Sequence, residues 1–207
     1  MSELRDVNIT EVCPRDGFQS LPQFIPTNEK LDIIHKLIDC GFEQLEVTSF
    51  VHPKAIPQLS DASEVFVNIE NNKEVNLRAL VPNMRGLERA IEAGVPKVKL
   101  MLSATDSHSL SNANCRTDQA IDSFKPLINL AEKNDTKVTG SISVAFGCPY
   151  EGVVSLDRLL SICEGYQKLS VNEISLADTA GMANPYQVRE VIRAIKQRFK
   201  NIKLTLH

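Results

Sequence analysis

The sequence predicts an α/β fold of the (β/α)8-barrel type, incomplete here at about seven strands and six helices, and three observations lead to it. Short runs rich in Val, Ile and Leu alternate with longer runs whose apolar residues recur at helical spacing. The G-x-G-x-x-G turn of a doubly wound sheet is absent from the sequence. Polar residues gather just after the expected strands, and a barrel of this type carries its chemistry at the C-terminal ends of its strands.

The elements follow from local signals along the chain. The first expected strand lies within residues 8–13 and ends at a turn, because Pro14 cannot donate a ladder hydrogen bond and Gly17 tolerates positive φ. A capped amphipathic helix runs from Thr27 to the Cys40-Gly41 pair. The segment 103–115, rich in Ser, Asn and Thr, is expected to be a loop. The other strands are expected at Gln44–Phe50, Asn76–Val81, Lys97–Leu102, Lys137–Ala145, Asn172–Ala177 and Asn201–Leu206, and the other helices at Asp61–Asn68, Met84–Ala93, Asp118–Lys133, Leu156–Lys168 and Pro185–Phe199.

The length and composition suit one globular domain over residues 1–207, with 43% hydrophobic and 24% charged residues. A complete barrel of this type takes about 250 residues and eight units. The expected elements stop at the seventh strand. We therefore expect a barrel domain truncated at its C-terminus, with an open sheet edge and no useful activity of its own.

The charge and the cysteine content limit the classes of partner and of site that the sequence allows. A net charge of −3 without a block of like charges gives no reason to expect nucleic acid or an anionic membrane, and favours a small molecule. No run approaches the roughly 20 apolar residues of a membrane span, and residues 1–6 are polar, so a cytoplasmic protein is expected. Five cysteines without C-x-x-C spacing argue against a disulfide framework and a zinc site.

Adjacent opposite charges at Arg15 and Asp16 form the first candidate site. An ionised Asp is a hard oxygen ligand suited to Mg²⁺ or Mn²⁺, and a guanidinium offers a planar fork of donors to a carboxylate, a phosphate or an enolate oxygen. Glu46 lies in an otherwise apolar or hydroxylic strand, where a carboxylate needs a partner or a metal. A structural ion pair at Glu46, and a backbone turn at Asp178, are the alternatives to a functional role.

Four stretches carry a resemblance that covers nearly the whole chain: Glu11–Gln19 (EVCPRDGFQ), Leu45–Val51 (LEVTSFV), Gly147–Gly152 (GCPYEG) and Glu173–Thr179 (EISLADT). In sequence and order they resemble the motifs of the 3-hydroxy-3-methylglutaryl-CoA lyase family, whose members are metal-dependent TIM-barrel enzymes. The resemblance implies retro-Claisen cleavage of 3-hydroxy-3-methylglutaryl-CoA into acetyl-CoA and acetoacetate with a bound Mg²⁺ or Mn²⁺.

The resemblance also implies roles for individual residues. Asp16 and His207 would be metal ligands, with His207 also suited to proton transfer, and Arg15 would stabilise the enolate oxygen while binding substrate. Glu46 and Asp178 would complete the catalytic group. The expected substrate contacts are Gln19, Ser49 and Asn112, and the expected partners are an acyl-CoA and a second copy of the chain in a dimer.

The sequence departs from the family pattern in several places. The second His of the family's His-x-His metal motif, its Asn ligand and its loop with a catalytic Cys would all lie beyond His207. Ser20–Gln23 stands where the family has a basic residue, which puts one contact to coenzyme A in question. His35, His52 and His108 lack ligand spacing, so surface or packing roles are expected, and no Ser or Cys can be placed beside a His from sequence.

Two other functions remain open at this point. A Claisen-type synthase related to isopropylmalate or homocitrate synthases would run the condensation instead of the cleavage. A shortened, non-catalytic paralogue would only bind other subunits. Assaying the complete enzyme for acetoacetate release separates the lyase from the synthase.

Overall fold

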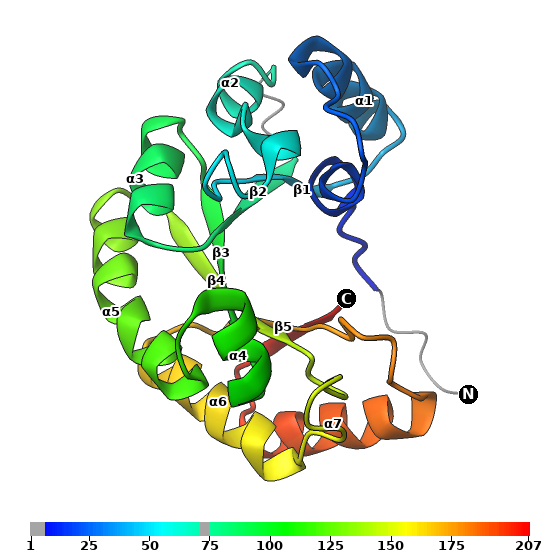
Figure 1. The fold of residues 1–207 in the computed structure, drawn as a ribbon, viewed down its shortest axis with the longest axis vertical. Coiled ribbons are helices and arrows are strands. Elements are labelled where there is room, and N and C mark those ends of the chain that lie inside the picture. The colour runs from blue at the N-terminus through cyan, green and yellow to red at the C-terminus, as the bar shows by residue number, and fades with distance from the viewer. Residues whose placement is uncertain (1–6, 71–74) are drawn as a thin grey trace. The chain divides into compact units, whose positions relative to one another are not determined.

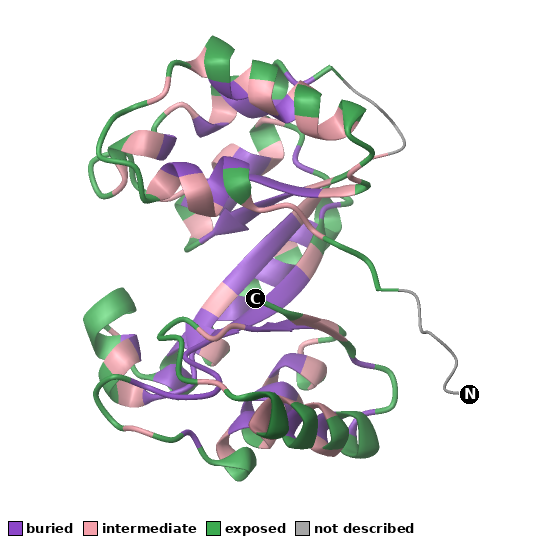
Figure 2. Ribbon diagram, turned by 90° about the vertical axis from the view of Figure 1, so that its right-hand side faces the viewer, coloured by how far each residue is buried: buried purple, intermediate pink, exposed green. Residues whose placement is uncertain are grey.

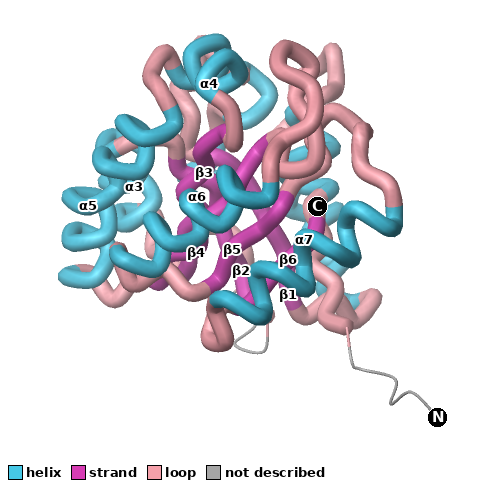
Figure 3. Tube along the Cα trace, turned by 90° about the horizontal axis from the view of Figure 1, so that it is seen from below, coloured by secondary structure: helices cyan, strands magenta, loops and turns pink. Residues whose placement is uncertain are grey.

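The computed structural model describes residues 7–70 and 75–207, so the polar segment 1–6 lies outside it. The chain divides into two compact units, Met1–Val98 and Lys99–His207 (Figure 1). The strands follow chain order in the sheet, β1-β2-β3-β4-β5-β6. A doubly wound sheet reverses its strand order at a switch point, and this order does not reverse. The predicted alternation of strands and helices is confirmed for most elements (Figure 3).

Unit 1 pairs two parallel strands and covers them with helices. Leu45 lies opposite Leu77 in that pair, and the register shifts between Glu46 and Thr48. Apolar residues from each helix and strand are buried between them, including Ile34, Leu59 and Leu87. The elements of this unit are the π-helical turn η1 (Cys13–Gly17), α1 (Thr27–Asp39), β1 (Gln44–Ser49), the 3₁₀ turn η2 (Pro57–Leu59), α2 (Ala62–Val67), β2 (Asn76–Val81) and α3 (Met84–Glu92).

The first expected strand, residues 8–13, is wrong as a strand. Glu11 alone makes a parallel bridge to Leu45, through Glu11 N to Gln44 O (2.9 Å) and Glu46 N to Glu11 O (2.8 Å). The Glu11 carboxylate then accepts hydrogen bonds from the backbone N–H groups of Val12 (2.8 Å) and Cys13 (2.7 Å). These side-chain contacts turn the chain into η1 before a ladder can extend.

Unit 2 contains most of β3 and three further strands. β4 and β5 are parallel with Ser141 opposite Ser175, and β6 continues the sheet with Thr205 opposite Ser175. The strands are largely buried apart from β6, and the helices expose one side (Figure 2). The elements are β3 (Lys97–Ser103), α4 (Asp106–Ala113), α5 (Thr117–Lys133), β4 (Lys137–Ser143), α6 (Leu156–Lys168), β5 (Glu173–Leu176), α7 (Pro185–Arg198) and β6 (Lys203–Leu206).

The segment 103–115 is not the loop that its composition predicts, because it contains α4. This helix buries only Ser109, so it lacks the apolar stripe by which helices are recognised. It ends at Asn114, which adopts the left-handed conformation at φ 54°. With α4 included and the first strand lost, the described residues hold six strands and seven α-helices instead of the expected seven and six.

None of the helices in the two described ranges has the length and apolar character needed to cross a bilayer.

Tyr166 of α6 fixes that helix to the sheet of unit 2. It is fully buried, and its ring lies where a Cβ on Gly140 of β4 would stand, so glycine is required there. Its hydroxyl lies 3.1 Å from the carbonyl of Leu100 and 3.0 Å from that of Ser141, on adjacent strands. Burial raises the pKa of the Tyr166 hydroxyl well above its ordinary value, so the group remains a neutral donor.

We expect Tyr166→Phe to lower the free energy of unfolding by about 1–3 kcal/mol, because it leaves a buried carbonyl without its donor. Urea denaturation checks this value. Tyr186→Phe is the matched control, since Tyr186 is 73% exposed and should change stability by less than about 0.5 kcal/mol. Equal effects of the two substitutions would contradict a stabilising role for the Tyr166 hydroxyl.

Candidate functional site

A buried ion pair between Arg15 and Glu46 is the centre of the site in unit 1. Arg15 Nε donates to Glu46 Oε1 at 2.6 Å, and Arg15 Nη1 donates to Asp16 Oδ1. The Glu46 side chain is 0% exposed and that of Arg15 9%, whereas Asp16 is 46% exposed. The guanidinium is therefore held between a buried carboxylate and one that solvent can reach.

The backbone of η1 explains how the Asp16 carboxylate comes to lie against the guanidinium of the preceding residue, Arg15. The N–H groups of Arg15 (3.0 Å) and Asp16 (2.7 Å) both donate to the carbonyl of Val12, which winds the chain tightly after Pro14. Pro14 occupies the first turn, where its missing N–H is not needed. The segment Pro14–Gly17 thus folds into a tight turn that fixes the position of Arg15.

Two other basic residues, Arg78 and Lys30, make side-chain hydrogen bonds in the same unit. Arg78 of β2 lies opposite Glu46 in the strand register, and its Nη2 donates to Gln44 Oε1 at 2.8 Å. Lys30 of α1 is 2% exposed and pairs with Asp61 at 2.6 Å, and it also donates to the carbonyl of Gln58. The Lys30 contact ties α1 to the loop that follows β1. Sequence reasoning missed these contacts, since their residues lie 28 or more positions apart.

The three expected substrate contacts occupy different environments. Gln19 is partly buried just after η1. Ser49, at the end of β1, is 1% exposed, and its hydroxyl has no hydrogen-bond partner among the described residues. Asn112 lies exposed on α4 in unit 2. Their roles in substrate binding stay predictions.

Asp178 and His207 meet through the backbone in unit 2. Asp178 N donates to His207 O at 2.9 Å, at the ends of β5 and β6. The Asp178 carboxylate accepts from the N–H groups of Met182 (2.9 Å) and Ala183 (3.1 Å). The side chain therefore shapes the loop before α7, which is the turn role that the sequence left open, and its catalytic role stays a prediction.

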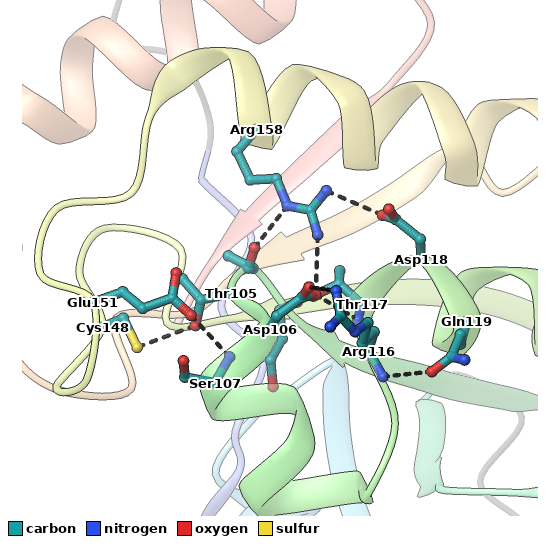
Figure 4. Close-up of polar contacts among 12 residues, drawn as sticks. Thr105, Asp106, Ser107, Arg116, Thr117, Asp118, Gln119, Cys148, Glu151 and Arg158 are labelled. Carbon is teal, nitrogen blue, oxygen red and sulfur yellow. Dashed lines mark hydrogen bonds and ion pairs between the residues drawn. The ribbon is translucent and has the colours of Figure 1, made fainter.

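A polar network in unit 2 joins α4 to the turn that carries the Gly147–Gly152 motif (Figure 4). Glu151 Oε1 accepts from Ser107 N at 2.8 Å, at the N-terminus of α4, and Thr105 Oγ1 donates to Cys148 Sγ at 3.1 Å. Arg158 of α6 donates to the carbonyl of Ala104 at 3.0 Å and to Asp118 at 3.0 Å. Cys148 is 1% exposed and fills a structural position.

His108 is not the isolated residue that its sequence spacing implies. It lies on α4 with its Nδ1 2.7 Å from Ser103 Oγ, and its ring centroid is 6.2 Å from that of Tyr150. Burial lowers the pKa of the His108 imidazole below its ordinary value of 6.5. Two sequence signals could have revealed α4, and with it this pair: a helix start at Thr105-Asp106 and a helix end at Asn114.

The donor set for a metal is present only in part within each unit. Among residues 7–70 and 75–207, no group of three or more His, Cys, Asp or Glu side chains is placed to hold a metal ion. Asp16 offers a half-exposed carboxylate, the ligand that a hard divalent cation prefers, and His207 offers an exposed imidazole. Each fits as a single ligand, so the metal assignment of Asp16 and His207 stays a prediction.

Comparison with known proteins identifies the family. A model of the HMGL-like family matches residues 6–207. The hydroxymethylglutaryl-CoA lyase YngG of Bacillus subtilis is 40% identical over 98% of this chain and 68% of its own length. The chain belongs to the HMGL-like family. A Pseudomonas aeruginosa lyase for 3-hydroxy-3-isohexenylglutaryl-CoA and hydroxymethylglutaryl-CoA is 34% identical over 98% of this chain and 68% of that protein.

Solved structures confirm the barrel-type fold of this HMGL-like chain. An HMG-CoA lyase from Acinetobacter baumannii, in complex with coenzyme A and 3-methylmalate, superposes with a TM-score of 0.92 at 40% identity, covering 97% of this chain and 65% of that one. The chain thus spans roughly two thirds of the length of these relatives. The resemblance inferred from the four motifs is confirmed at the level of family and fold.

We expect Glu46→Ala to destabilise the protein by about 3–5 kcal/mol, because it removes the buried counter-charge of the Arg15 guanidinium and leaves only the half-exposed Asp16 carboxylate beside it. Chemical denaturation measures this change. Lys36→Ala is the matched control, since it removes an ion pair to Asp32 whose side chains are 70% and 63% exposed, and such pairs contribute less than about 1 kcal/mol. A loss below about 1 kcal/mol in Glu46→Ala would show that Arg15 keeps another counter-charge.

Proposed function

We propose that this protein cleaves 3-hydroxy-3-methylglutaryl-CoA into acetyl-CoA and acetoacetate with a divalent metal, Mg²⁺ or Mn²⁺. The observation that carries the proposal is the identity of 34–40% to enzymes named as such lyases over nearly the whole chain. The buried Arg15–Glu46 pair beside the exposed Asp16 supports it, because it places a fixed positive charge next to a metal-type carboxylate.

Arg15 would act on the acetyl half of the substrate. Breaking the carbon–carbon bond moves an electron pair toward the thioester carbonyl, whose oxygen becomes an enolate. A guanidinium already fixed by Glu46 needs no reorganisation to stabilise this oxygen, and preorganised donors are the largest single contribution in many enzymes. Glu46 would act through Arg15 by fixing its orientation.

Proton removal from the tertiary hydroxyl would start the cleavage. His207, as a neutral imidazole, suits the role of base, and Asp178 would hold the neighbouring loop in place. A bound divalent cation lowers the pKa of a hydroxyl that it coordinates. Asp16 and His207 are the residues we propose as its ligands, with Gln19, Ser49 and Asn112 contacting the substrate.

The wider assignments rest on the same relatives. The A. baumannii lyase binds coenzyme A, which supports an acyl-CoA substrate for this chain. We also propose one barrel domain, a cytoplasmic location and a homodimer.

A Claisen-type synthase is the alternative function, and it would consume acetyl-CoA and a 2-oxo acid. Incubation of the full-length gene product with 3-hydroxy-3-methylglutaryl-CoA and Mn²⁺ decides between them: acetoacetate release supports the lyase, and its absence contradicts it.

The role of Arg15 is tested by Arg15→Met in the full-length gene product. We expect kcat to fall by at least ~10²-fold, the loss that follows removal of a donor to a developing oxyanion. Mn²⁺ affinity should change much less, because the metal carboxylate remains. Near-normal turnover in steady-state assays would remove Arg15 from the mechanism.

The role of Asp16 is tested by metal titration instead of turnover. Asp16→Ala should abolish tight Mn²⁺ binding, because it removes the hard carboxylate ligand. His35→Ala is the control: His35 lies on α1, where its Nε2 accepts a backbone N–H from Glu70, and its loss should leave Mn²⁺ affinity unchanged. Equal Mn²⁺ affinities for wild type and Asp16→Ala would refute the assignment.

A further inference from the structure

A buried lysine in unit 1 connects two segments that lie far apart in the sequence. Lys30 of α1 is 2% exposed, and its ammonium group donates to Asp61 Oδ1 and to the carbonyl of Gln58, both at 2.6 Å. The same group lies 4.2 Å from the centre of the Phe24 ring. Thr27, three residues earlier on α1, donates to the second Asp61 oxygen at 2.8 Å. We call Phe24, Thr27, Lys30, Gln58 and Asp61 the Lys30 clamp.

The Lys30 clamp reaches the segment that follows η1 through Gln58. The side-chain Nε2 of Gln58 donates to the carbonyl of Leu21 at 2.8 Å, while its backbone carbonyl accepts from Lys30. Leu21 in turn donates its N–H to Phe18 O at 3.2 Å. The helical run that starts with η1 is therefore anchored at its start by the Glu11 bridge to β1 and at its end by Gln58.

This helical run carries three of the residues assigned to the proposed reaction, Arg15, Asp16 and Gln19. Arg15 has its own buried partner in Glu46, and it contacts Asp16 through Nη1. Gln19 is partly buried and lies two residues before Leu21, so it is the member of this group closest in sequence to the anchored carbonyl. The position of Gln19 therefore depends on the anchor at Leu21 more than the position of Arg15 does.

The side chain of Asp61 is used in a way that local stability does not explain. Asp61 is the N-cap residue of α2, where an aspartate ordinarily accepts from the first N–H groups of its own helix, but it makes no such cap contact. Both of its oxygens accept from α1 instead, and its side chain is 8% exposed. A buried ion pair adds little stability compared with packed apolar residues of similar volume. What it does impose is one geometry, because its two groups must stay within hydrogen-bond reach.

We propose that Lys30 is a positioning residue for substrate binding, which acts through Gln58 and Leu21 to hold Gln19 in place. This rests on the proposed function, in which Gln19 contacts the substrate. Arg15 keeps its orientation through Glu46 whether or not the Lys30 clamp is intact. Loss of the clamp therefore weakens substrate binding and leaves the chemical step, in which Arg15 acts, nearly unchanged.

The first experiment replaces the ion pair by apolar residues in the full-length gene product. In the double variant Lys30→Met/Asp61→Leu no buried charge is left unpaired, so the urea midpoint should stay at or above that of wild type. KM for 3-hydroxy-3-methylglutaryl-CoA should rise by about tenfold, while kcat changes by less than about twofold. A wild-type KM in this double variant is what a purely structural pair predicts, and it would overturn the proposal whatever the urea midpoint.

The matched control removes an exposed ion pair from the same helix. Lys36 and Asp32 of α1 pair at 2.6 Å with side chains that are 70% and 63% exposed. Lys36→Met/Asp32→Leu should leave KM and kcat at their wild-type values, because this pair does not contact the segment after η1. A rise in KM equal to that of Lys30→Met/Asp61→Leu would overturn a specific role for Lys30.

Gln58→Ala tests the same connection without changing a buried charge. The Gln58 side chain is partly exposed, and its removal breaks the contact to the Leu21 carbonyl while Lys30 and Asp61 stay paired. We expect KM to rise by about three- to tenfold, the loss that corresponds to one net hydrogen bond, with kcat nearly unchanged. A wild-type KM in Gln58→Ala would overturn the proposal even if Lys30→Met/Asp61→Leu does not fold.

Amide hydrogen exchange tests the Lys30 clamp without substrate, so its failure is distinct from failure of the proposed function. The Leu21 N–H should exchange at least about tenfold faster in Gln58→Ala than in wild type, whereas the Glu46 N–H, which donates to Glu11 O, should keep its rate. An unchanged Leu21 rate would overturn the proposal even if acetoacetate is released. Absence of acetoacetate from wild type would overturn the proposed function and with it the role of Lys30 in substrate binding, while faster Leu21 exchange would still show that the clamp holds this segment.

Discussion

The buried ion pair between Arg15 and Glu46 is the constraint on which the site of unit 1 depends. A carboxylate with 0% exposure is expensive to bury alone, and the guanidinium offsets that cost only if it stays within hydrogen-bond reach. The π-helical turn η1 keeps it there, since Val12 accepts from two consecutive N–H groups and Glu11 satisfies the donors before them. A strand at this position would have left the guanidinium without a fixed orientation.

The ion pair also sets the environment of the neighbouring Asp16 carboxylate. Asp16 shares the guanidinium but remains 46% exposed, so it can exchange part of its hydration for a cation while Arg15 stays fixed by Glu46. In the proposed mechanism the buried Glu46 orients Arg15, and the half-exposed Asp16 would be the metal ligand. The Lys30–Asp61 pair repeats the first half of this arrangement one helix further along the chain, where it anchors the loop after β1.

Unit 2 positions its polar groups differently, through neutral hydrogen bonds, helix ends and ion pairs at partly exposed residues such as Arg158 and Asp118. The Tyr166 hydroxyl reaches the carbonyls of Leu100 and Ser141, and Glu151 occupies the N-terminus of α4 with its carboxylate. A negative charge at a helix N-terminus is favoured by the helix dipole. The Gly-Cys-Pro-Tyr-Glu-Gly motif therefore has a structural meaning of its own: Cys148 accepts from Thr105, and Glu151 and Tyr150 hold the helix that carries His108.

The sequence by itself determined the elements whose patterns are local. Periodic apolar residues fixed α1, α3, α6 and α7 to within about two residues, and β2 and α6 were predicted with their observed bounds, because spacing along one helix or strand is visible in the chain. It also marked Arg15, Asp16 and Glu46, because charges beside a proline and a glycine or within an apolar strand are conspicuous.

Tertiary structure alone decided the rest. Glu11 ended a strand through its own side chain, the polar α4 had no apolar stripe to reveal it, and Ser103 met His108 only because α4 folds back over the end of β3. Such contacts depend on which side chains face each other after folding, and no spacing rule records that.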